Sequence, residues 1–206
     1  MNRVDPYADA PRLPEDGPLD LRDVLGAGSE PVELELGPGR GWFLVDRLRS
    51  VPGCRMVGLE IRRKWATIVD RRLQQYGLAS RGRVFAADAR EVLSRLPASS
   101  IARTFVHFPD PWWKKRHQKR LLLSSAVIVE IGRVLEPGGE LFVQTDVLER
   151  ADGYERLIGA CPSFESWGPS PRVSENPYET RSPRERRAVA DELPIVRLRY
   201  RCVRAP

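Results

Sequence analysis

Short apolar runs alternate regularly with longer helix-like stretches along most of this chain, from Pro31 onward. Runs of this kind, bounded by turn residues, are typical of a parallel sheet covered by helices on both faces. The runs expected as strands are residues 32–37, 55–61, 83–88, 102–108 and 140–146. The stretches expected as helices are residues 42–50, 62–77, 89–96, 119–135 and 147–160. The alternation predicts an α/β fold with a doubly wound, mostly parallel sheet.

The two ends of the chain depart from this alternation. Residues 1–30 are rich in Pro, Asp and Gly and show little periodicity, so we expect a flexible or loosely packed N-terminal arm. Residues 194–202 alternate apolar and basic side chains as a half-exposed strand does, which suits an antiparallel edge of the sheet. The length of 206 residues suits one domain with a sizeable core, which we place at residues 31–206.

Composition narrows the class of protein further. No apolar run approaches the roughly 20 residues that a membrane span needs, and the acidic, Pro-rich start lacks the features of a signal peptide. We therefore expect a soluble, cytoplasmic protein. Cys54, Cys161 and Cys202 lie far apart, without a CxxC pair or clustered His, so we expect neither a disulfide framework nor a metal site.

Positive charge is concentrated in two parts of the chain, although the net charge is only +6. Residues 114–120 hold five Lys or Arg and one His, and residues 181–204 hold eight Arg against three acidic residues. Clusters of this kind suit a polyanionic partner such as a nucleic acid. Each cluster taken alone is equally compatible with a solvated helix face.

The strongest local signal is a glycine-rich turn, in which Gly37, Gly39 and Gly41 follow the first expected strand and lead into a helix. Glycines let the backbone turn sharply and let a ligand approach it closely. The spacing is GxGxG, whereas a dinucleotide site has GxGxxG and presents a helix N-terminus to a pyrophosphate. S-adenosylmethionine has no phosphate, so the turn favours it as the cofactor.

Two acidic residues stand at the ends of the next two expected strands. Glu60 lies about twenty residues beyond the glycine turn, where a carboxylate meets ribose hydroxyls in folds of this kind. Asp88 ends the following strand and is placed to receive the adenine amino group. Ligands of open parallel sheets bind at the carboxyl ends of the strands, so the three strand ends should converge. The alternative is that Glu60 and Asp88 only cap helices.

The segment after the fourth expected strand, FPDPWWKKRHQKR, is the most unusual in the chain. Pro109 and Pro111 stiffen the loop around Asp110 and fix its carboxylate at a strand end. The tryptophan pair at 112–113 can stack on a purine, and at least one of the two is expected to cover the sheet instead. The basic run at 114–120 can hold phosphates.

This segment, Phe108 to Arg120, closely resembles the signature FPDPWxKKRHxKRR of the bacterial tRNA (guanine-N7)-methyltransferases. The resemblance extends from about Glu33 to Tyr200. It implies a Rossmann-like methyltransferase fold with a seven-stranded sheet, and transfer of a methyl group from S-adenosylmethionine to N7 of a guanine in tRNA. The usual target of the family is guanosine 46 of the variable loop. The resemblance implies tRNA as partner, with no membrane and no metal, and a monomer or homodimer.

The resemblance also implies roles for individual residues. Asp110 would be the catalytic residue and would also contact the cofactor. The remaining cofactor contacts, counting the whole glycine turn, would be Glu35, Gly37, Gly39, Gly41, Glu60 and Asp88. The substrate-binding residues would be Lys114, Asp146, Asn176, Tyr178 and Glu179, with Asn176 where the family usually has Thr. The basic run itself predicts the residues that contact tRNA phosphates, which are Lys115, Arg116, Lys119 and Arg120.

The chemistry at N7 needs no general base, because that nitrogen carries an unshared pair and no proton. Asp110 is the candidate to stabilise the cation as it forms. His107 is expected to be structural, and His117 to touch phosphate. Three alternatives stay open: a methyltransferase of small molecules or proteins, which would not need residues 114–120; a nicotinamide-dependent oxidoreductase, which GxGxG disfavours; and an inactive RNA-binding protein.

Overall fold

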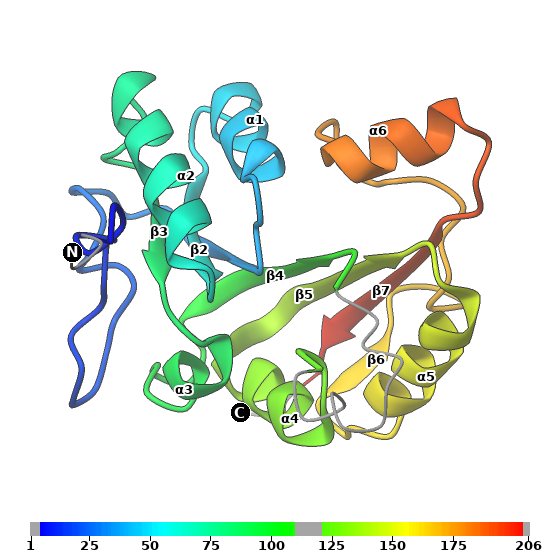
Figure 1. Cartoon of the computed structure of the whole chain (residues 1–206). Helices are drawn as coiled ribbons and strands as arrows, with labels where there is room; N and C mark the ends of the chain where they lie inside the picture. Colours follow the sequence, from blue (N-terminus) through cyan, green and yellow to red (C-terminus); the bar gives the residue numbers. More distant parts are fainter. Residues whose placement is uncertain (1–4, 110–120, 204–206) are drawn as a thin grey trace.

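The computed structural model describes residues 5–109 and 121–203, which form a single mixed sheet flanked by helices (Figure 1). The strands are β1 (Val32–Leu36), β2 (Arg55–Glu60), β3 (Gly82–Ala86), β4 (Ile101–His107), β5 (Leu135–Thr145), β6 (Phe164–Ser166) and β7 (Val196–Cys202). The helices are α1 (Trp42–Ser50), α2 (Arg63–Gln75), α3 (Ala89–Leu93), α4 (Ser125–Val134), α5 (Leu148–Gly159) and α6 (Pro183–Ala190). The strand order is β3-β2-β1-β4-β5-β7-β6, and β1 to β5 pair in parallel. The α/β fold expected from the sequence is confirmed.

Helices cover both faces of the sheet, with α1, α2 and α6 on one side and α3, α4 and α5 on the other (Figure 1). Strand side chains alternate between the two faces. Phe105 and Phe142 join the core under α1 and α2, whereas Val106 and Val143 join the core on the other face. Burial on both faces explains why these strands appear in the sequence as nearly continuous apolar runs.

Several of the expected elements differ in their limits or position; β5, for example, begins at Leu135 instead of residue 140. The helix expected over residues 119–135 begins at Ser125, because the side chain of Ser124 accepts a hydrogen bond from Val127 N at 3.4 Å and caps the first turn. The late strand is antiparallel to β5 as expected, but it lies one position inside the edge. The short strand β6, which has no clear sequence pattern, pairs outside it.

Residues 5–30 contain no helix or strand and contribute side chains to the core. Four leucines of this segment are buried in the main core: Leu13, Leu19, Leu21 and Leu25. The buried guanidinium of Arg55 donates to Gly26 O at 2.7 Å and to Gly28 O at 2.9 Å. The segment follows an irregular path, so its side chains show no periodicity even where they are buried. The division of the chain at residue 30 stays a prediction.

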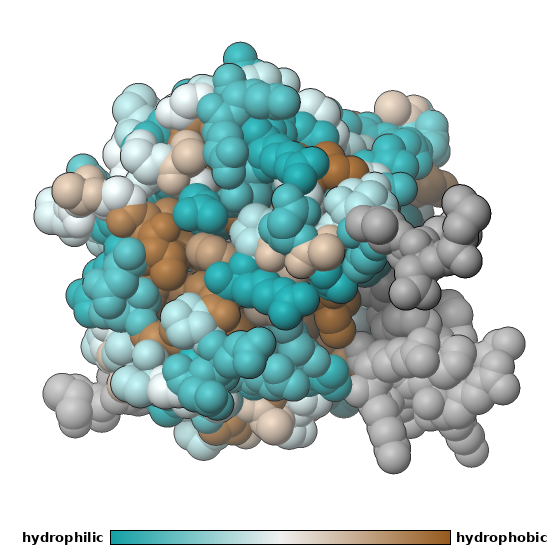
Figure 2. Space-filling model, turned by 60° about the vertical axis from the view of Figure 1, so that its left-hand side comes forward, coloured by the Kyte–Doolittle hydropathy of each residue, from teal (hydrophilic) through white to brown (hydrophobic). Residues whose placement is uncertain are grey.

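The face shown in Figure 2 carries mostly hydrophilic side chains, and apolar side chains gather on it chiefly in one irregular area left of centre. Within residues 5–109 and 121–203, no helix is both long enough and apolar enough to cross a membrane.

Candidate active site

A cavity of about 590 Å³ lies at the carboxyl ends of the parallel strands. Gly37 follows β1, Glu60 ends β2, Asp88 follows β3 and His107 ends β4, and all of them line the cavity together with Phe108. Parallel strands bring their carboxyl ends to one edge of the sheet, so residues far apart in the sequence meet there. Three of the residues expected to bind cofactor are thereby brought together.

The glycine turn leaves open space above its backbone. Gly37 and Gly39 have φ of 71° and 55°, in the left-handed region that favours glycine. A Cβ atom on Gly39 would find no atom within 4 Å, and Gly39 N donates to Glu60 Oε2 at 2.9 Å. Gly41 has a different role, since a Cβ there would lie 2.2 Å from Val69 Cγ1 of α2. Helix packing therefore requires Gly41.

The two carboxylates at the strand ends line the cavity and also accept hydrogen bonds at the starts of helices. Asp88 is the N-cap of α3 and accepts from Arg90 N at 2.9 Å. Hydrogen bonds from the Arg90 side chain lower the pKa of Asp88, against the opposing effect of burial. Glu60 Oε1 accepts from the backbone N of Arg62, the N-cap residue of α2. Asp88 therefore caps a helix, as the alternative interpretation expects, and it lines the cavity as well.

Glu35 lies behind the cavity wall and pairs with His107. Glu35 Oε1 lies 2.9 Å from His107 Nδ1, and the two side chains are only 3% and 4% exposed. Glu35 itself is outside the lining of the cavity. The expected cofactor contact of Glu35 stays a prediction.

The backbone is unusual where the chain leaves β4. Phe108 has φ of 48°, a conformation that is rare for a bulky side chain, and its N donates to Gln144 O at 2.8 Å. Sequence patterns gave no signal for this turn. Residues 110–120 lie outside the described part of the chain, so the expected roles of Asp110, Lys114, Lys115, Arg116, Lys119 and Arg120 stay predictions.

The residues expected to bind substrate beyond β5 are held by other protein groups. Asp146 Oδ2 accepts from the guanidinium of Arg184 on α6 at 2.6 Å. Asn176 Oδ1 accepts from Tyr178 N at 2.9 Å, and Asn176 Nδ2 donates to the buried Glu185 at 2.8 Å. The side chain of Asn176 therefore organises its own turn.

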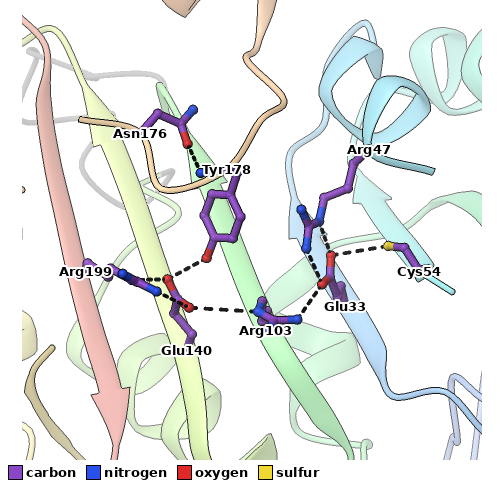
Figure 3. A network of polar contacts seen from close by, with 8 residues as sticks. All are labelled: Glu33, Arg47, Cys54, Arg103, Glu140, Asn176, Tyr178 and Arg199. Atoms are coloured by element: carbon purple, nitrogen blue, oxygen red, sulfur yellow. Dashed lines mark hydrogen bonds and ion pairs between the residues drawn. The ribbon is translucent and has the colours of Figure 1, made fainter. Parts of the chain in front are cut away.

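Tyr178 is anchored in a network that crosses the sheet (Figure 3). Its hydroxyl donates to Glu140 Oε1 at 2.5 Å, and Glu140 also accepts from Arg199 Nε at 2.6 Å. Arg103 links Glu140 to Glu33, with Arg103 Nη1 donating to Glu33 Oε1 at 2.8 Å. Burial, and then the charge of Glu140, raise the pKa of Tyr178. The network was not foreseen, because its members are paired across strands rather than along the sequence.

Glu179 points to a shallow polar pocket of about 420 Å³. Asp46 and Arg49 of α1 line it, together with Arg181 and Arg186 from the α6 side. Of the substrate residues expected after β5, Glu179 is the exposed one in the turn. Glu179 therefore lies at a surface that a large substrate can reach.

Comparisons with known proteins agree with the fold. A family model described as "Putative methyltransferase" matches residues 29–198. A tRNA (guanine-N(7)-)-methyltransferase of Parasynechococcus marenigrum (strain WH8102) is 33% identical over 178 residues, which are 84% of this chain and 75% of the relative. The protein of that name from Myxococcus xanthus (strain DK1622) is 34% identical over 172 residues, 83% of each chain.

Among solved structures, the 16S rRNA methyltransferase KamB is similar in fold, with a TM-score of 0.62 at 16% identity. The similarity covers 89% of this chain and 91% of that one. The likeness to this structure concerns the fold alone. The family model and the two sequence relatives show that the chain belongs to the tRNA (guanine-N(7)-)-methyltransferase family.

Proposed function

We propose that this chain transfers a methyl group from S-adenosylmethionine to N7 of guanosine 46 in the variable loop of tRNA, forming 7-methylguanosine. The proposal rests on one observation: a single cavity is lined by Gly37, Glu60 and Asp88. The segment Phe108 to Arg120, with its basic run, continues from the wall of that cavity. The relatives that are named for this activity support the choice of substrate.

The cavity residues fit S-adenosylmethionine. The volume of about 590 Å³ is in the range of small-molecule sites. The open turn at Gly37 and Gly39 admits close backbone contact, and the carboxylates of Glu60 and Asp88 can accept from hydroxyl and amino groups. The GxGxG spacing of the turn differs from the GxGxxG of dinucleotide sites, which argues against a nicotinamide dinucleotide.

S-adenosylmethionine supplies a methyl group activated by its sulfonium sulfur. The N7 lone pair attacks the methyl carbon as the carbon–sulfur bond breaks, so the purine becomes cationic and S-adenosylhomocysteine is left. The protein needs no general base, and its task is to align the two reactants, which contributes as much as about 7–11 kcal/mol. In this proposal Asp110 stabilises the purine cation, and Glu35, the glycine turn, Glu60 and Asp88 hold the donor.

The tRNA is held from two sides of the strand ends. Lys114 and Asp146 bind the guanosine region, and the phosphate contacts are Lys115, Arg116, Lys119 and Arg120. Glu179 contacts the substrate, while Asn176 and Tyr178 keep the turn that carries it against the sheet. In this proposal the enzyme acts on tRNA in the cytoplasm, and it does so as a monomer or a homodimer.

Incubation of the purified chain with methyl-labelled S-adenosylmethionine and unmodified tRNA, followed by nucleoside analysis, tests the proposal. Label should appear in 7-methylguanosine, and a transcript with adenosine in place of guanosine 46 should accept none. Label in another nucleoside would contradict the proposed reaction.

Two variants test the proposed roles of residues in the loop. Single-turnover methylation by Asp110→Ala should be strongly slowed, and a wild-type rate in the folded variant would remove Asp110 from the mechanism. Replacing Lys115 and Arg116 together should flatten the dependence of tRNA affinity on salt by up to about two units of log–log slope. An unchanged slope would show that these charges face away from the RNA.

A further inference from the structure

Helix α6 adds little to the apolar core, although it is attached to the sheet by polar groups. Of its eight residues only Glu185 and Ala188 are buried. Glu185 accepts from the Arg197 side chain of β7 at 3.0 Å and from Asn176 Nδ2 at 2.8 Å. A buried ion pair of this kind is seldom a net source of stability compared with apolar packing. Core packing alone therefore gives no reason for this helix.

The outward side chains of this segment are positively charged. Four of them are exposed arginines, which we call the α6 patch: Arg181, just before the helix, and Arg184, Arg186 and Arg187 within it. From Arg181 to Ala190 the only acidic residue is Glu185, which is completely buried and pairs with Arg197 instead. The exposed face of the helix therefore offers cations with no acidic side chain of its own beside them.

The α6 patch reaches the cavity at the strand ends. The guanidinium carbon of Arg184 lies 5.7 Å from the centroid of the Phe108 ring, and Phe108 lines the cavity. Arg181 and Arg186 continue from there to the shallow pocket beside α1, where Arg49 also lies. Helices α1 and α6 stand on the same side of the sheet (Figure 1). Positive charge thus extends from the cavity across α6 to the end of α1.

We propose that the α6 patch binds the phosphate backbone of the tRNA beside the guanosine that is methylated. This inference rests on the proposed function and adds a second charged surface to the basic run at 114–120. Arginine suits the role, because its planar guanidinium can donate two parallel hydrogen bonds to a phosphate and stays charged. Phosphate contacts fix position without reading sequence, so the patch orients the tRNA independently of its bases.

The carboxylates that pair with two members of the patch do not prevent phosphate binding. Arg184 pairs with Asp146 at 2.6 Å and Arg186 with Asp46 at 3.2 Å, and the two arginine side chains are 61% and 52% exposed. Ion pairs this exposed contribute little, so exchanging one for a phosphate costs little. A phosphate that takes over Arg184 also frees the Asp146 carboxylate for the guanosine region, which is the role expected of Asp146.

The salt dependence of tRNA affinity in the full chain tests the patch. Within residues 5–109 and 121–203, neither Arg181 nor Arg187 forms an ion pair, so Arg181→Gln with Arg187→Gln should keep the fold. Each lost phosphate contact lowers the log–log slope by about 0.7–0.9, so this double variant should lose about 1.4–1.8 units of slope. Its affinity at about 0.15 M salt should fall at least roughly tenfold. Arg181→Lys with Arg187→Lys keeps both charges and should keep most of the slope.

Arg156→Gln with Arg201→Gln is the control matched in charge. Both side chains are exposed, but they lie towards the amino ends of the parallel strands, away from the cavity. Arg156 is in the last turn of α5, and Arg201 is in register with Glu140, where the pairing of β5 with β7 begins. The control should bind tRNA as the wild type does. A loss equal to that of the α6 double variant would show an effect of net charge alone and overturn the inference.

The remaining outcomes separate this inference from the proposed function. A wild-type chain that neither binds nor methylates tRNA would overturn both. In Arg181→Gln with Arg187→Gln, KM for tRNA should rise at least roughly tenfold while kcat and the affinity for S-adenosylhomocysteine stay unchanged. Methylation with an unchanged KM, or an unchanged salt slope, would overturn the inference alone. Loss of binding to polyglutamate without loss of tRNA affinity would assign the patch to an acidic protein segment and equally overturn it.

A measurement on the wild-type chain covers the case in which the double variant does not fold. Bound tRNA should slow hydrogen exchange of the backbone amides in α6, residues 183–190, because the helix has few contacts of its own that protect it. Amides in α5, residues 148–159, lie on the other face of the sheet and should exchange at the same rate with and without tRNA. Exchange in α6 that tRNA leaves unchanged would contradict the contact.

Discussion

Replacing Tyr178 by Phe removes one hydroxyl from the centre of the network in Figure 3 and keeps the ring. The hydroxyl donates to Glu140 Oε1 at 2.5 Å. The ring stays packed edge-on against Phe105 and Phe142, with centroids 5.0 Å and 5.2 Å away. The change therefore isolates one hydrogen bond to a buried carboxylate, which keeps its ion pair with Arg199.

The expected cost follows from the charge of the acceptor. A hydrogen bond to a charged group contributes about 1.5–3 kcal/mol to the free energy of unfolding, against about 0.5–1.5 kcal/mol for a neutral pair. Tyr200→Phe is the matched control, since its buried hydroxyl donates to the neutral backbone oxygen of Glu155 at the longer distance of 3.3 Å. At roughly 2–4 °C per kcal/mol for a chain of this length, Tyr178→Phe should lower Tm by roughly 3–12 °C.

Urea unfolding followed by circular dichroism measures both variants, with the m value checked for two-state behaviour. Tyr178→Phe should lose more stability than Tyr200→Phe, and S-adenosylhomocysteine should still bind. Unchanged stability in Tyr178→Phe together with a large loss of tRNA methylation would refute the anchoring role and return the hydroxyl to the substrate.

Other consequences of the structure can be measured in the same way. Burial and the nearby charge of Glu33 raise the pKa of Cys54 to about 12, so its thiol should react with a disulfide reagent at pH 8 only after unfolding; rapid reaction of the native chain at this residue would contradict this. Gly41→Ala brings a Cβ to 2.2 Å from Val69 Cγ1 and should cost at least about 1–3 kcal/mol in chemical unfolding, whereas wild-type stability would refute the packing role. Burial alone would raise the pKa of Glu33, but the hydrogen bonds and charge of Arg47 outweigh it and lower that pKa. The Glu33–Arg47 pair therefore stabilises the fold fully at pH values above about 4.3, the pKa of glutamate in the unfolded chain. This stabilisation is lost as the pH falls through the lower pKa of Glu33 in the folded protein. Glu33→Gln should cost about 3–5 kcal/mol at pH 7, and the difference from wild type should shrink below about pH 4; a difference independent of pH would contradict the pairing.

Periodic elements could be predicted from the sequence, because burial imposes their pattern on it. The limits of α1 match the expected helix, and those of β2 differ from expectation by one residue. The sequence does not predict helix α6, because it is held by a buried ion pair between Glu185 and Arg197 more than by an apolar face. The burial of leucines within residues 5–30 cannot be predicted either, because isolated leucines in an irregular segment follow no period.

In the candidate site, too, some residues could be predicted from the sequence pattern and others could not. Glu60 ends a strand, and Gly37 and Asp88 follow strands, so the rule on strand ends is enough to bring them together. The side chains that bind Glu33 are set by the register of β1 against β4 and by the position of α1, and neither can be predicted from the sequence. The acidic residues of β1 alternate as solvent-facing ones do, yet all five positions of the strand are buried.

The central claim is that the ends of adjacent parallel strands hold the methyl donor beside the segment that begins at Phe108. A crystal structure of the chain with S-adenosylhomocysteine measures this most directly. The account predicts the ligand in the cavity lined by Gly37, Glu60 and Asp88, with Asp110 beside its sulfur. Density for the ligand elsewhere on the protein, or Asp110 remote from the sulfur, would contradict it.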